Sequence, residues 1–314
     1  MFEGYSRNRN QGATGVIQWM MNNAWPSHIW HLYDYYLTTG GGYFGAKKAT
    51  KQIHALLTYD DGSVWIVNNY QNSPVFNVEV EASIFALNGT RAWHWKSQSA
   101  MELDSYASKM LTVVPINGEL DTPSDVYFVR LNWTWSGTSA TNGEGASMAT
   151  GDNYYWLGKQ MDILNWTDSN FYRTPCLQWA NFSALDTLPT PTLSLTSSSS
   201  GFHAGAGPDG EPRCMGRFTI ANTGSTVAFF IEAIVHRGGS ATVFPTTFSE
   251  NYFTLLPSAD EASTKTIGVS VSMEDIVHVE SFNAPQTPTP SADVLHSCDE
   301  LHLQLNSWKG TPIV

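Results

Sequence analysis

One apolar run constrains the fold of this chain more than any other feature. Residues 14–21 (TGVIQWMM) are nearly continuously apolar, which is typical of a β-strand buried on both faces. Met1 to Asn10 is expected to end a helix, and further helices are expected at Ile29–Leu37 and Tyr43–Thr50. Helix, buried strand, loop and helix is the order of a β/α unit, but one unit cannot bury its own strand. Residues 1–52 therefore predict the end of a larger α/β structure, part of which precedes this chain.

From Ile53 onward the sequence changes to short strands separated by turn residues. Residues 60–62 (DDG) lie between two apolar runs and are typical of a hairpin turn. Residues 77–85 alternate between polar and apolar side chains, which is the period of a half-buried strand. A first β-sandwich is therefore expected over residues 53–187. Its strands are expected at Ile53–Tyr59, Ser63–Asn69, Asn77–Phe85, Lys109–Ile116, Asp125–Trp135 and Tyr154–Leu157.

A second β-sandwich is expected over residues 188–284, after a Pro-rich linker. Residues 197–212, rich in Ser, Gly and Pro, are expected to form a mobile loop. A further Pro-rich stretch separates residues 285–314, a tail to which the sequence assigns no structure. The chain as a whole is therefore expected to be mainly β. The strands of the second sandwich are expected at Leu193–Thr196, Arg217–Ala221, Val227–His236, Tyr252–Leu256, Thr266–Val271 and Val277–Phe282.

Charge and composition exclude several classes of partner. Sixteen basic and 28 acidic residues give a formal net charge of −12, so no nucleic acid is expected as a partner. No apolar run is long enough to span a bilayer, so no membrane partner is expected. Cys176, Cys214 and Cys298 are too few for a disulfide framework, and one bridge or three free thiols are both compatible with them. The aromatic content of 13% suits sandwich cores and also stacking against sugar rings.

No self-contained catalytic or cofactor-binding signature is present, so the sequence assigns no catalytic residue, no metal and no cofactor. His28 and His31 have a helix-compatible metal spacing but no third ligand nearby, and the group His296, Cys298 and His302 in the acidic tail is not assigned a metal either. Sugar hydrolysis needs paired carboxylates. No candidate follows a buried parallel strand, where a barrel places its chemistry. The carboxylates considered are Asp34, Asp60, Asp61, Glu79, Glu81 and Asp152.

Residues 18–26 (QWMMNNAWP) are the segment that best suits sugar binding. Aromatic and amide side chains that leave a buried strand offer a stacking surface and hydrogen bonds to hydroxyl groups. Packing in a core explains Trp19 about as well, because most large aromatic side chains are buried.

Longer motifs resemble a known family. Residues 1–8 (MFEGYSRN), 15–37 (GVIQWMMNNAWPSHIWHLYDYYL) and 40–49 (GGGYFGAKKA) resemble the final βα unit of the barrel in exo-β-D-glucosaminidases of glycoside hydrolase family 2. Later segments are similar to the two sandwiches that follow this barrel, the last of which is immunoglobulin-like. These segments are residues 59–64 (YDDGSV), 153–166 (NYYWLGKQMDILNW), 221–225 (ANTGS) and 249–257 (SENYFTLLP), so the resemblance extends from Met1 to about Asn283.

The resemblance implies a fold and a reaction. The reaction is retaining glycoside hydrolysis, in which one carboxylate attacks the anomeric carbon and another protonates the leaving oxygen. The family carries both carboxylates on earlier barrel strands, so this chain alone is predicted to be inactive. The implied fold is the last βα unit of a (β/α)8 TIM barrel (residues 1–52), two immunoglobulin-like β-sandwich domains (53–187 and 188–284) and a tail (285–314).

The resemblance also implies four substrate-binding residues. It places Trp19 at the floor of the sugar-binding subsite, and it places Asn22, Asn23 and Trp25 on the loop at the barrel mouth. The related β-mannosidases tend to carry Asn-Asp where Asn22 and Asn23 stand, which favours the glucosaminidase branch.

The expected function is the C-terminal part of an exo-glycosidase that removes β-linked glucosamine from the non-reducing end of chitosan oligosaccharides. Its expected partners are an oligosaccharide substrate and the missing N-terminal half of the enzyme. An endo-β-mannosidase or β-mannosidase of the same family, a non-catalytic carbohydrate-binding protein and an unrelated sandwich protein are the alternatives. The sequence assigns no compartment.

Overall fold

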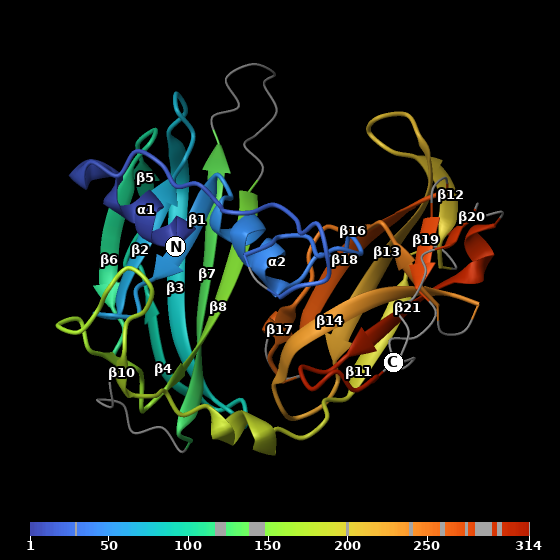
Figure 1. Ribbon diagram of the computed structural model, residues 1–314. Coiled ribbons are helices and arrows are strands. Elements are labelled where there is room, and N and C mark those ends of the chain that lie inside the picture. Colours follow the sequence, from blue (N-terminus) through green and yellow to red (C-terminus); the bar gives the residue numbers. More distant parts are fainter. Residues whose placement is uncertain are drawn as a thin grey trace. The chain divides into compact units, whose positions relative to one another are not determined.

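The structure is a computed structural model of the 314-residue chain (Figure 1). It describes residues 1–313 apart from residue 29 and the segments 117–123, 138–147, 199–200, 239–240, 258–260, 274–275, 280–290 and 294–296. Strands are far more numerous than helices in this part of the chain, so the predicted mainly β class is confirmed. No helix within the described ranges is both long and apolar enough to cross a membrane.

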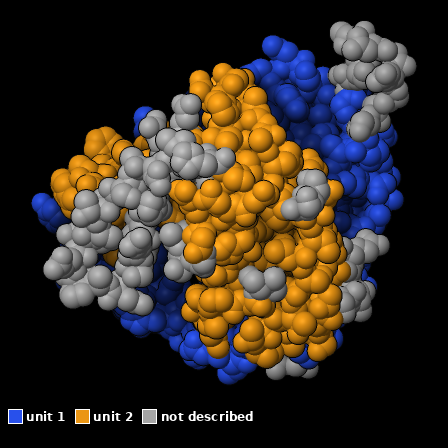
Figure 2. Space-filling model, turned by 90° about the vertical axis from the view of Figure 1, so that its right-hand side faces the viewer, with its two compact units in different colours: residues 1–17, 46–188 blue, residues 18–45, 189–314 orange. Residues whose placement is uncertain are grey.

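The described chain forms two compact units, which Figure 2 colours separately. The first unit comprises residues 1–17 and 46–188, and the second comprises residues 18–45 and 189–314. The chain passes between the two units near Leu188, where the sequence has its Pro-rich linker. Residues 1–52, in contrast, are divided between the units instead of forming a unit of their own.

At the two ends of residues 1–52 the chain forms short helices close to the predicted ones. Helix α1 (Phe2–Arg7) continues into the 3-10 helix η1 (Asn8–Gln11). Helix α2 (Gly41–Ala49) overlaps the predicted helix at 43–50.

The barrel-like strand and helix predicted between these ends do not form. Residues 14–21 contain no strand. The predicted helix at 29–37 is absent from its described residues, 30–37, and Trp30 and Leu37 there have positive φ angles of 64° and 66°. A strand needs neighbouring strands to satisfy its backbone N–H and C=O groups. No such neighbours pair with residues 14–21 in the described structure, so the predicted strand at 14–21 and the predicted helix at 29–37 are wrong for the described residues.

The first unit is an antiparallel β-sandwich. One sheet has the strand order β4-β3-β7-β8 with β5 paired to β3, and the other has the order β1-β2-β6. Their facing side chains form one apolar core that includes Ile66, Leu131 and Trp133. A separate two-stranded sheet joins β9 and β10. The strands are β1 (Ile53–Leu57), β2 (Ser63–Asn68), β3 (Val75–Ala86), β4 (Arg91–Lys96), β5 (Met101–Leu103), β6 (Ser108–Val113), β7 (Val126–Gly137), β8 (Met148–Gly158), β9 (Ile163–Leu164) and β10 (Cys176–Gln178), followed by the 3-10 helix η2 (Ser183–Thr187).

The predicted turn at residues 60–62 connects β1 to β2. Asp61 accepts hydrogen bonds from the Thr58 hydroxyl and from the Ser63 backbone N–H, the latter at 2.9 Å. These hydrogen bonds, led by that from Thr58, lower the pKa of Asp61 to about 2. Gly62 has a φ of +69°, and a Cβ there would lie 2.4 Å from the Val114 carbonyl oxygen, so the turn requires glycine.

The second unit is also an antiparallel β-sandwich. One sheet has the order β11-β13-β18-β16 with β12 paired to β13, and the other has the order β17-β14-β15-β19-β20 with β21 paired to β14. Phe44 of α2 belongs to the same apolar core as both sheets. The strands are β11 (Leu193–Ser197), β12 (His203–Ala206), β13 (Pro212–Asn222), β14 (Ala228–Arg237), β15 (Ala241–Phe244), β16 (Thr246–Phe248), β17 (Phe253–Leu255), β18 (Thr264–Ser272), β19 (Ile276–Val279), β20 (Ser291–Asp293) and β21 (Leu301–Asn306), with short 3-10 helices η3 (Glu261–Ser263) and η4 (Cys298–Glu300).

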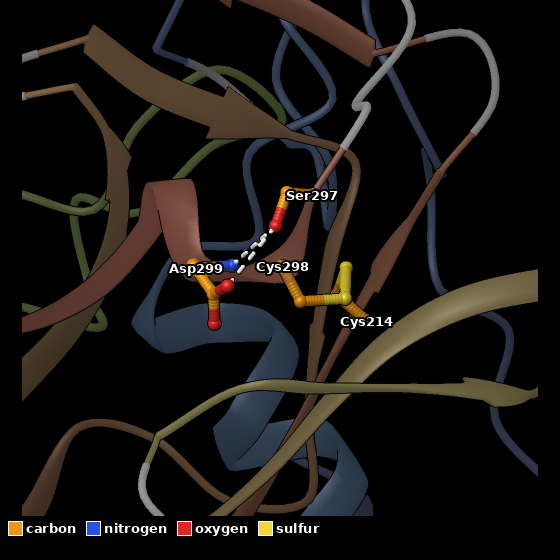
Figure 3. Close-up of a disulfide and its surroundings, with 4 residues drawn as sticks. All are labelled: Cys214, Ser297, Cys298 and Asp299. Atoms are coloured by element: carbon orange, nitrogen blue, oxygen red, sulfur yellow. Dashed lines mark hydrogen bonds between the residues drawn. A yellow bond between two sulfur atoms is a disulfide. The ribbon is translucent and has the colours of Figure 1, made fainter.

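Two segments without predicted strands contribute to this second sandwich. The predicted loop at 197–212 contains β12, which forms a hairpin with β13. The tail at 285–314 contains β21, which pairs with β14 over six residues from Glu232 to Arg237. A disulfide joins Cys214 in β13 to Cys298 in η4 (Figure 3). Cys176 is free. The Ser297 hydroxyl accepts a hydrogen bond from the Asp299 N–H at 3.2 Å and caps η4 beside this disulfide.

Candidate functional site

The four residues that the sequence singles out for sugar binding lie on one irregular loop of the second unit, residues 18–33, which we call the tryptophan loop. Its two ends are joined by backbone hydrogen bonds. The N–H groups of Leu32 and Tyr33 both donate to the Met21 carbonyl at 2.9 Å, and the Met20 N–H donates to the Trp30 carbonyl at 2.5 Å. Backbone pairing between its ends therefore holds the loop, in place of pairing to a sheet.

Three tryptophans of the tryptophan loop face solvent. Trp19, Trp25 and Trp30 are 69%, 69% and 61% exposed. Exposed indole rings are unusual in a folded chain, because a buried aromatic side chain removes a large apolar area from water. The alternative that Trp19 packs in a core is therefore not what this structure shows.

The two asparagines of the tryptophan loop have different surroundings. Asn22 is exposed and its backbone forms a parallel bridge with Tyr33. Asn23 is buried and donates from Nδ2 to the Ser27 hydroxyl at 3.0 Å. Asn22 thus presents an amide to solvent, whereas the Asn23 side chain helps to fix the conformation of the loop.

Trp30 was not among the predicted site residues. The sequence interpretation placed it inside a helix, where one tryptophan has no special meaning. Its spacing from Trp19 and Trp25 in a short segment is the signal that could have identified it. Indole faces and an exposed amide are groups that stack on sugar C–H surfaces and bind hydroxyls, so the loop is suited to carbohydrate but carries no acid–base chemistry of its own.

Three of the carboxylates considered in the sequence, Asp61, Glu79 and Glu81, have structural contacts in the first unit. Asp61 is held in the turn already described. Glu79 and Glu81 both lie 3.1 Å from the Lys96 ammonium, and hydrogen bonding to Lys96 and Asn132 lowers the pKa of Glu81 against the opposing effect of its burial, which is the largest single influence. Because Glu79 and Glu81 share the Lys96 ammonium on the sheet surface, they do not form an acid–nucleophile pair.

A buried polar cluster joins α1 to the first sandwich. Glu3 Oε1 lies 2.6 Å from His54 Nε2 and accepts hydrogen bonds from Asn153 Nδ2 at 3.0 Å and from the Tyr155 hydroxyl at 2.9 Å. Burial, reinforced by the Glu3 charge, raises the pKa of Tyr155 well above its ordinary value. The hydroxyl of Tyr155 in turn accepts from the Leu57 N–H at 3.0 Å. These hydrogen bonds to Glu3 hold the helix against the sandwich.

The structure describes most, but not all, of the two histidine groups weighed in the sequence. Among the described residues no three His, Cys, Asp or Glu side chains are arranged to hold a metal ion. Cys298 is in a disulfide and cannot be a thiolate ligand, His302 stacks on His236, and His296 lies outside the described residues.

Part of the chain matches a known domain family. Residues 171–284 match the Ig-fold domain of exo-β-D-glucosaminidase. This range includes the whole of the predicted second sandwich, residues 188–284, and confirms its immunoglobulin-like class.

Curated relatives extend the similarity over most of the chain. An exo-β-D-glucosaminidase of Hypocrea jecorina is 32% identical over 260 residues, which are 82% of this chain and 27% of that protein. An exo-β-D-glucosaminidase of Streptomyces avermitilis is 31% identical over 304 residues, which are 93% of this chain and 31% of that protein. The chain thus spans less than a third of the length of these relatives.

Solved structures also resemble this chain in fold. The crystal structure of the exo-chitosanase CsxA of Amycolatopsis orientalis aligns with 99% of this chain at a TM-score of 0.72 and 26% sequence identity, and the aligned part is 32% of that protein. A β-D-mannosidase of Dictyoglomus thermophilum aligns with 93% of the chain at a TM-score of 0.50 and 14% identity, which shows a shared fold alone.

Proposed function

We propose that this chain, whose residues 171–284 match the Ig-fold domain of exo-β-D-glucosaminidase, is the C-terminal portion of an enzyme of this kind. The proposed reaction removes β-linked glucosamine from the non-reducing end of chitosan oligosaccharides. The observation that carries the proposal is the sequence similarity over 82% and 93% of the chain to two enzymes of this one name. The β-mannosidase alternative is supported only at the level of the fold.

The proposed chemistry uses carboxylates that this chain does not supply. Retaining hydrolysis needs a nucleophile and an acid about 5–5.5 Å apart. The carboxylates of Asp61, Glu79, Glu81 and Glu3 are committed to a turn, to Lys96 or to the α1 cluster. We therefore assign both catalytic carboxylates to the two thirds of the relatives that lie outside the match, and we predict that this chain alone does not turn over substrate.

The proposed contribution of the chain to the site is the tryptophan loop. Trp19 would stack against the C–H face of the terminal sugar, with Asn22, Asn23 and Trp25 beside it at the mouth of the pocket. The exposed ring of Trp19 and the exposed amide of Asn22 support these roles, because both groups are available to a ligand. Trp30, exposed on the same loop, is a further candidate for this surface.

A chimera tests the proposal. The matching C-terminal third of the Amycolatopsis orientalis enzyme would be replaced by this chain, and release of p-nitrophenol from PNP-β-D-glucosaminide and from the β-D-mannoside would be measured. Activity of the chimera on the glucosaminide, with none from the chain alone, is the expected result. Greater activity on the mannoside would favour the alternative, and turnover by the chain alone would contradict the assignment of the carboxylates.

The role of Trp19 is tested in the same chimera. Aromatic stacking on a nucleic-acid base is worth about 1–3 kcal/mol. Applied to a sugar, this range predicts that Trp19→Ala lowers kcat/KM by roughly tenfold to a hundredfold. Trp166, 71% exposed in the first unit, provides a matched control whose replacement by alanine should leave kcat/KM unchanged. Equal loss in both variants, or none in either, would remove Trp19 from the site.

A further inference from the structure

The second unit contains a pocket of about 200 Å³ that the tryptophan loop does not line. It lies between the turn at residues 34–39 and strands β14, β15 and β16, and we call it the β14 pocket. Ala233, Val235, Val243 and Phe248 contribute to its lining and are buried, so part of its wall is apolar. The ring of Tyr252, also in the lining, is held by Phe230 and Phe44 at centroid distances of 5.2 and 5.8 Å.

Two carboxylates line the β14 pocket. Glu232 Oε1 accepts a hydrogen bond from the Tyr252 hydroxyl at 2.7 Å, and Oε2 accepts one from Asn306 Nδ2 at 3.2 Å. Asp34 Oδ1 accepts from the N–H groups of Tyr36 and Thr38 at 2.9 and 2.8 Å. These neutral donors fix both carboxylates in position without neutralising their charge, and Oδ2 of Asp34 remains able to accept another hydrogen bond.

The β14 pocket has a negative field. No lysine, arginine or histidine is among its described lining residues. Burial, followed by the charges of Glu232 and Asp34, raises the pKa of Tyr252 far above its ordinary value. The charges of both carboxylates therefore reach the Tyr252 hydroxyl in the pocket lining. A cation that enters the pocket would gain from both charges in surroundings that screen them less than bulk water does.

Hydroxyl groups complete the lining. Thr38, Thr39, Thr242 and Thr246 are all half-buried and all contribute to the pocket. The Thr246 hydroxyl donates to the Val243 carbonyl at 2.7 Å, which leaves its oxygen to accept from a ligand. Apolar wall, fixed carboxylates and hydroxyls together are suited to an organic molecule, whereas a bare metal ion would need a closer set of oxygen ligands than the described residues provide.

We propose that the β14 pocket binds a small protonated amine that carries hydroxyl groups, of the size of a single amino-sugar ring. Its ammonium group would lie against Glu232 and Asp34, its ring against the apolar wall and its hydroxyls against the threonines. The volume is below the range of about 300–1,000 Å³ that drug-sized ligands occupy, which favours one ring over an oligosaccharide. The choice of an amino sugar among hydroxylated amines rests on the proposed function, whereas the preference for a cation rests on the pocket alone.

Titration of the full chain with three matched sugars tests the proposal. D-glucosamine, N-acetyl-D-glucosamine and D-glucose would be added at neutral pH and followed by calorimetry and by NMR of the threonine methyl groups. Glucosamine should bind at least about tenfold more tightly than the two neutral sugars. Methyl signals of Thr38, Thr39 and Thr242 in the unmodified chain should shift with it. Equal binding of all three sugars, no binding, or shifts elsewhere only would overturn the proposal.

Variants separate the β14 pocket from the tryptophan loop. Glu232→Gln and Asp34→Asn keep hydrogen-bond acceptors and remove one charge each, so each should weaken glucosamine binding about tenfold at an unchanged melting temperature. Glu79→Gln, a charge removal in the first unit, should leave glucosamine binding unchanged. Loss of binding in Trp19→Ala alone would assign the ligand to the tryptophan loop and overturn this proposal while sparing the proposed function. An inactive chimera, together with intact glucosamine binding that depends on Glu232 and Asp34, would contradict the proposed function and leave the proposal for the β14 pocket standing.

Discussion

Trp133 in strand β7 is 1% exposed, whereas Trp19 in the tryptophan loop is 69% exposed. Both lie within apolar runs that suggest strands, but only the run around Trp133 has pairing partners in the described structure. Strand β7 pairs with β3 on one side and with β8 on the other, and the opposite sheet covers its inner face. Residues 14–21 have no such partners in the described structure. The difference teaches that an apolar run becomes a buried strand only when the rest of its sheet is present, and that without it the same side chains remain available for binding.

Substitution of the two tryptophans should give the largest difference. Trp133→Ala removes a fully buried indole and should lower the free energy of unfolding of the first unit by about 3–5 kcal/mol. Trp19→Ala removes an exposed one and should change stability by less than about 0.5 kcal/mol. Denaturant unfolding of both variants measures this. Comparable losses would show that Trp19 is buried after all, and the comparison would fail.

Removal of the disulfide tests whether the second sandwich relies on a covalent tie that the tryptophan loop lacks. Cys214 and Cys298 are 84 residues apart in sequence. Closing so long a loop restricts the unfolded chain, so the Cys214→Ala/Cys298→Ala double variant should lose about 2–5 kcal/mol. Calorimetric unfolding should show this in the second unit, with the first unit and acrylamide quenching of the exposed tryptophans unaffected. A Cys176→Ala variant is the control, and an effect of that variant on the same transition would point to a different bridge.

Loss of the Glu3 side chain should release helix α1 from the first sandwich and expose it. Glu3→Ala leaves the buried polar groups of His54, Asn153 and Tyr155 without their shared acceptor, which should cost about 1–3 kcal/mol. Limited proteolysis should then cut near α1, whereas in the unmodified chain the first cuts should fall within residues 12–40. Glu3→Gln retains an acceptor and should lose less than Glu3→Ala. Identical cleavage in all three proteins would show that the cluster does not anchor the helix.

The smallest effect should come from Asp61. Its pKa is lowered to about 2 in the folded chain, below its ordinary value of 3.8, so it stabilises the fold above about pH 4 and loses that contribution as the pH falls towards 2. Because the side chain is exposed, the effect should be under about 1 kcal/mol. Asp61→Asn should flatten the acid limb of stability measured between these values. Asp60→Asn, the neighbouring exposed aspartate in the same turn, should leave that limb steep, and equal flattening in both variants would contradict the assignment.

Local patterns predicted those parts of the fold that depend on neighbours in sequence. The turn at residues 60–62 and the alternation at residues 77–85 need only nearby residues, and both elements formed where expected. The strand predicted at residues 14–21 did not form, because a strand also needs pairing partners from other parts of the sequence, which no local pattern reports. Strand β21 (LHLQLN) alternates with period two, so its sequence did carry a signal, and only its isolation in a polar tail concealed it.

The candidate sites also differ in whether the sequence could predict them. Trp19, Asn22, Asn23 and Trp25 came from a motif match, and their roles stay proposals. The β14 pocket brings Asp34 together with Glu232, nearly two hundred positions later, through the packing of a turn against a strand. The pairing of Cys214 with Cys298 likewise depends on which of three cysteines meet in space, so the sequence could only leave it open.

The pairing of β21 with β14 has a consequence for the order in which the chain can fold. During synthesis β14 emerges early, but its partner follows only after β15 to β20 have left the ribosome. Until then the edge of β14 that faces β21 is unpaired, and for most of that time Cys298, the disulfide partner of Cys214, has not been made. The first unit, whose last strand is β10, can complete its sheets while the second is still being made. Nascent chains stalled after β18 should therefore display a folded first sandwich beside a second one that recruits chaperones through that open edge.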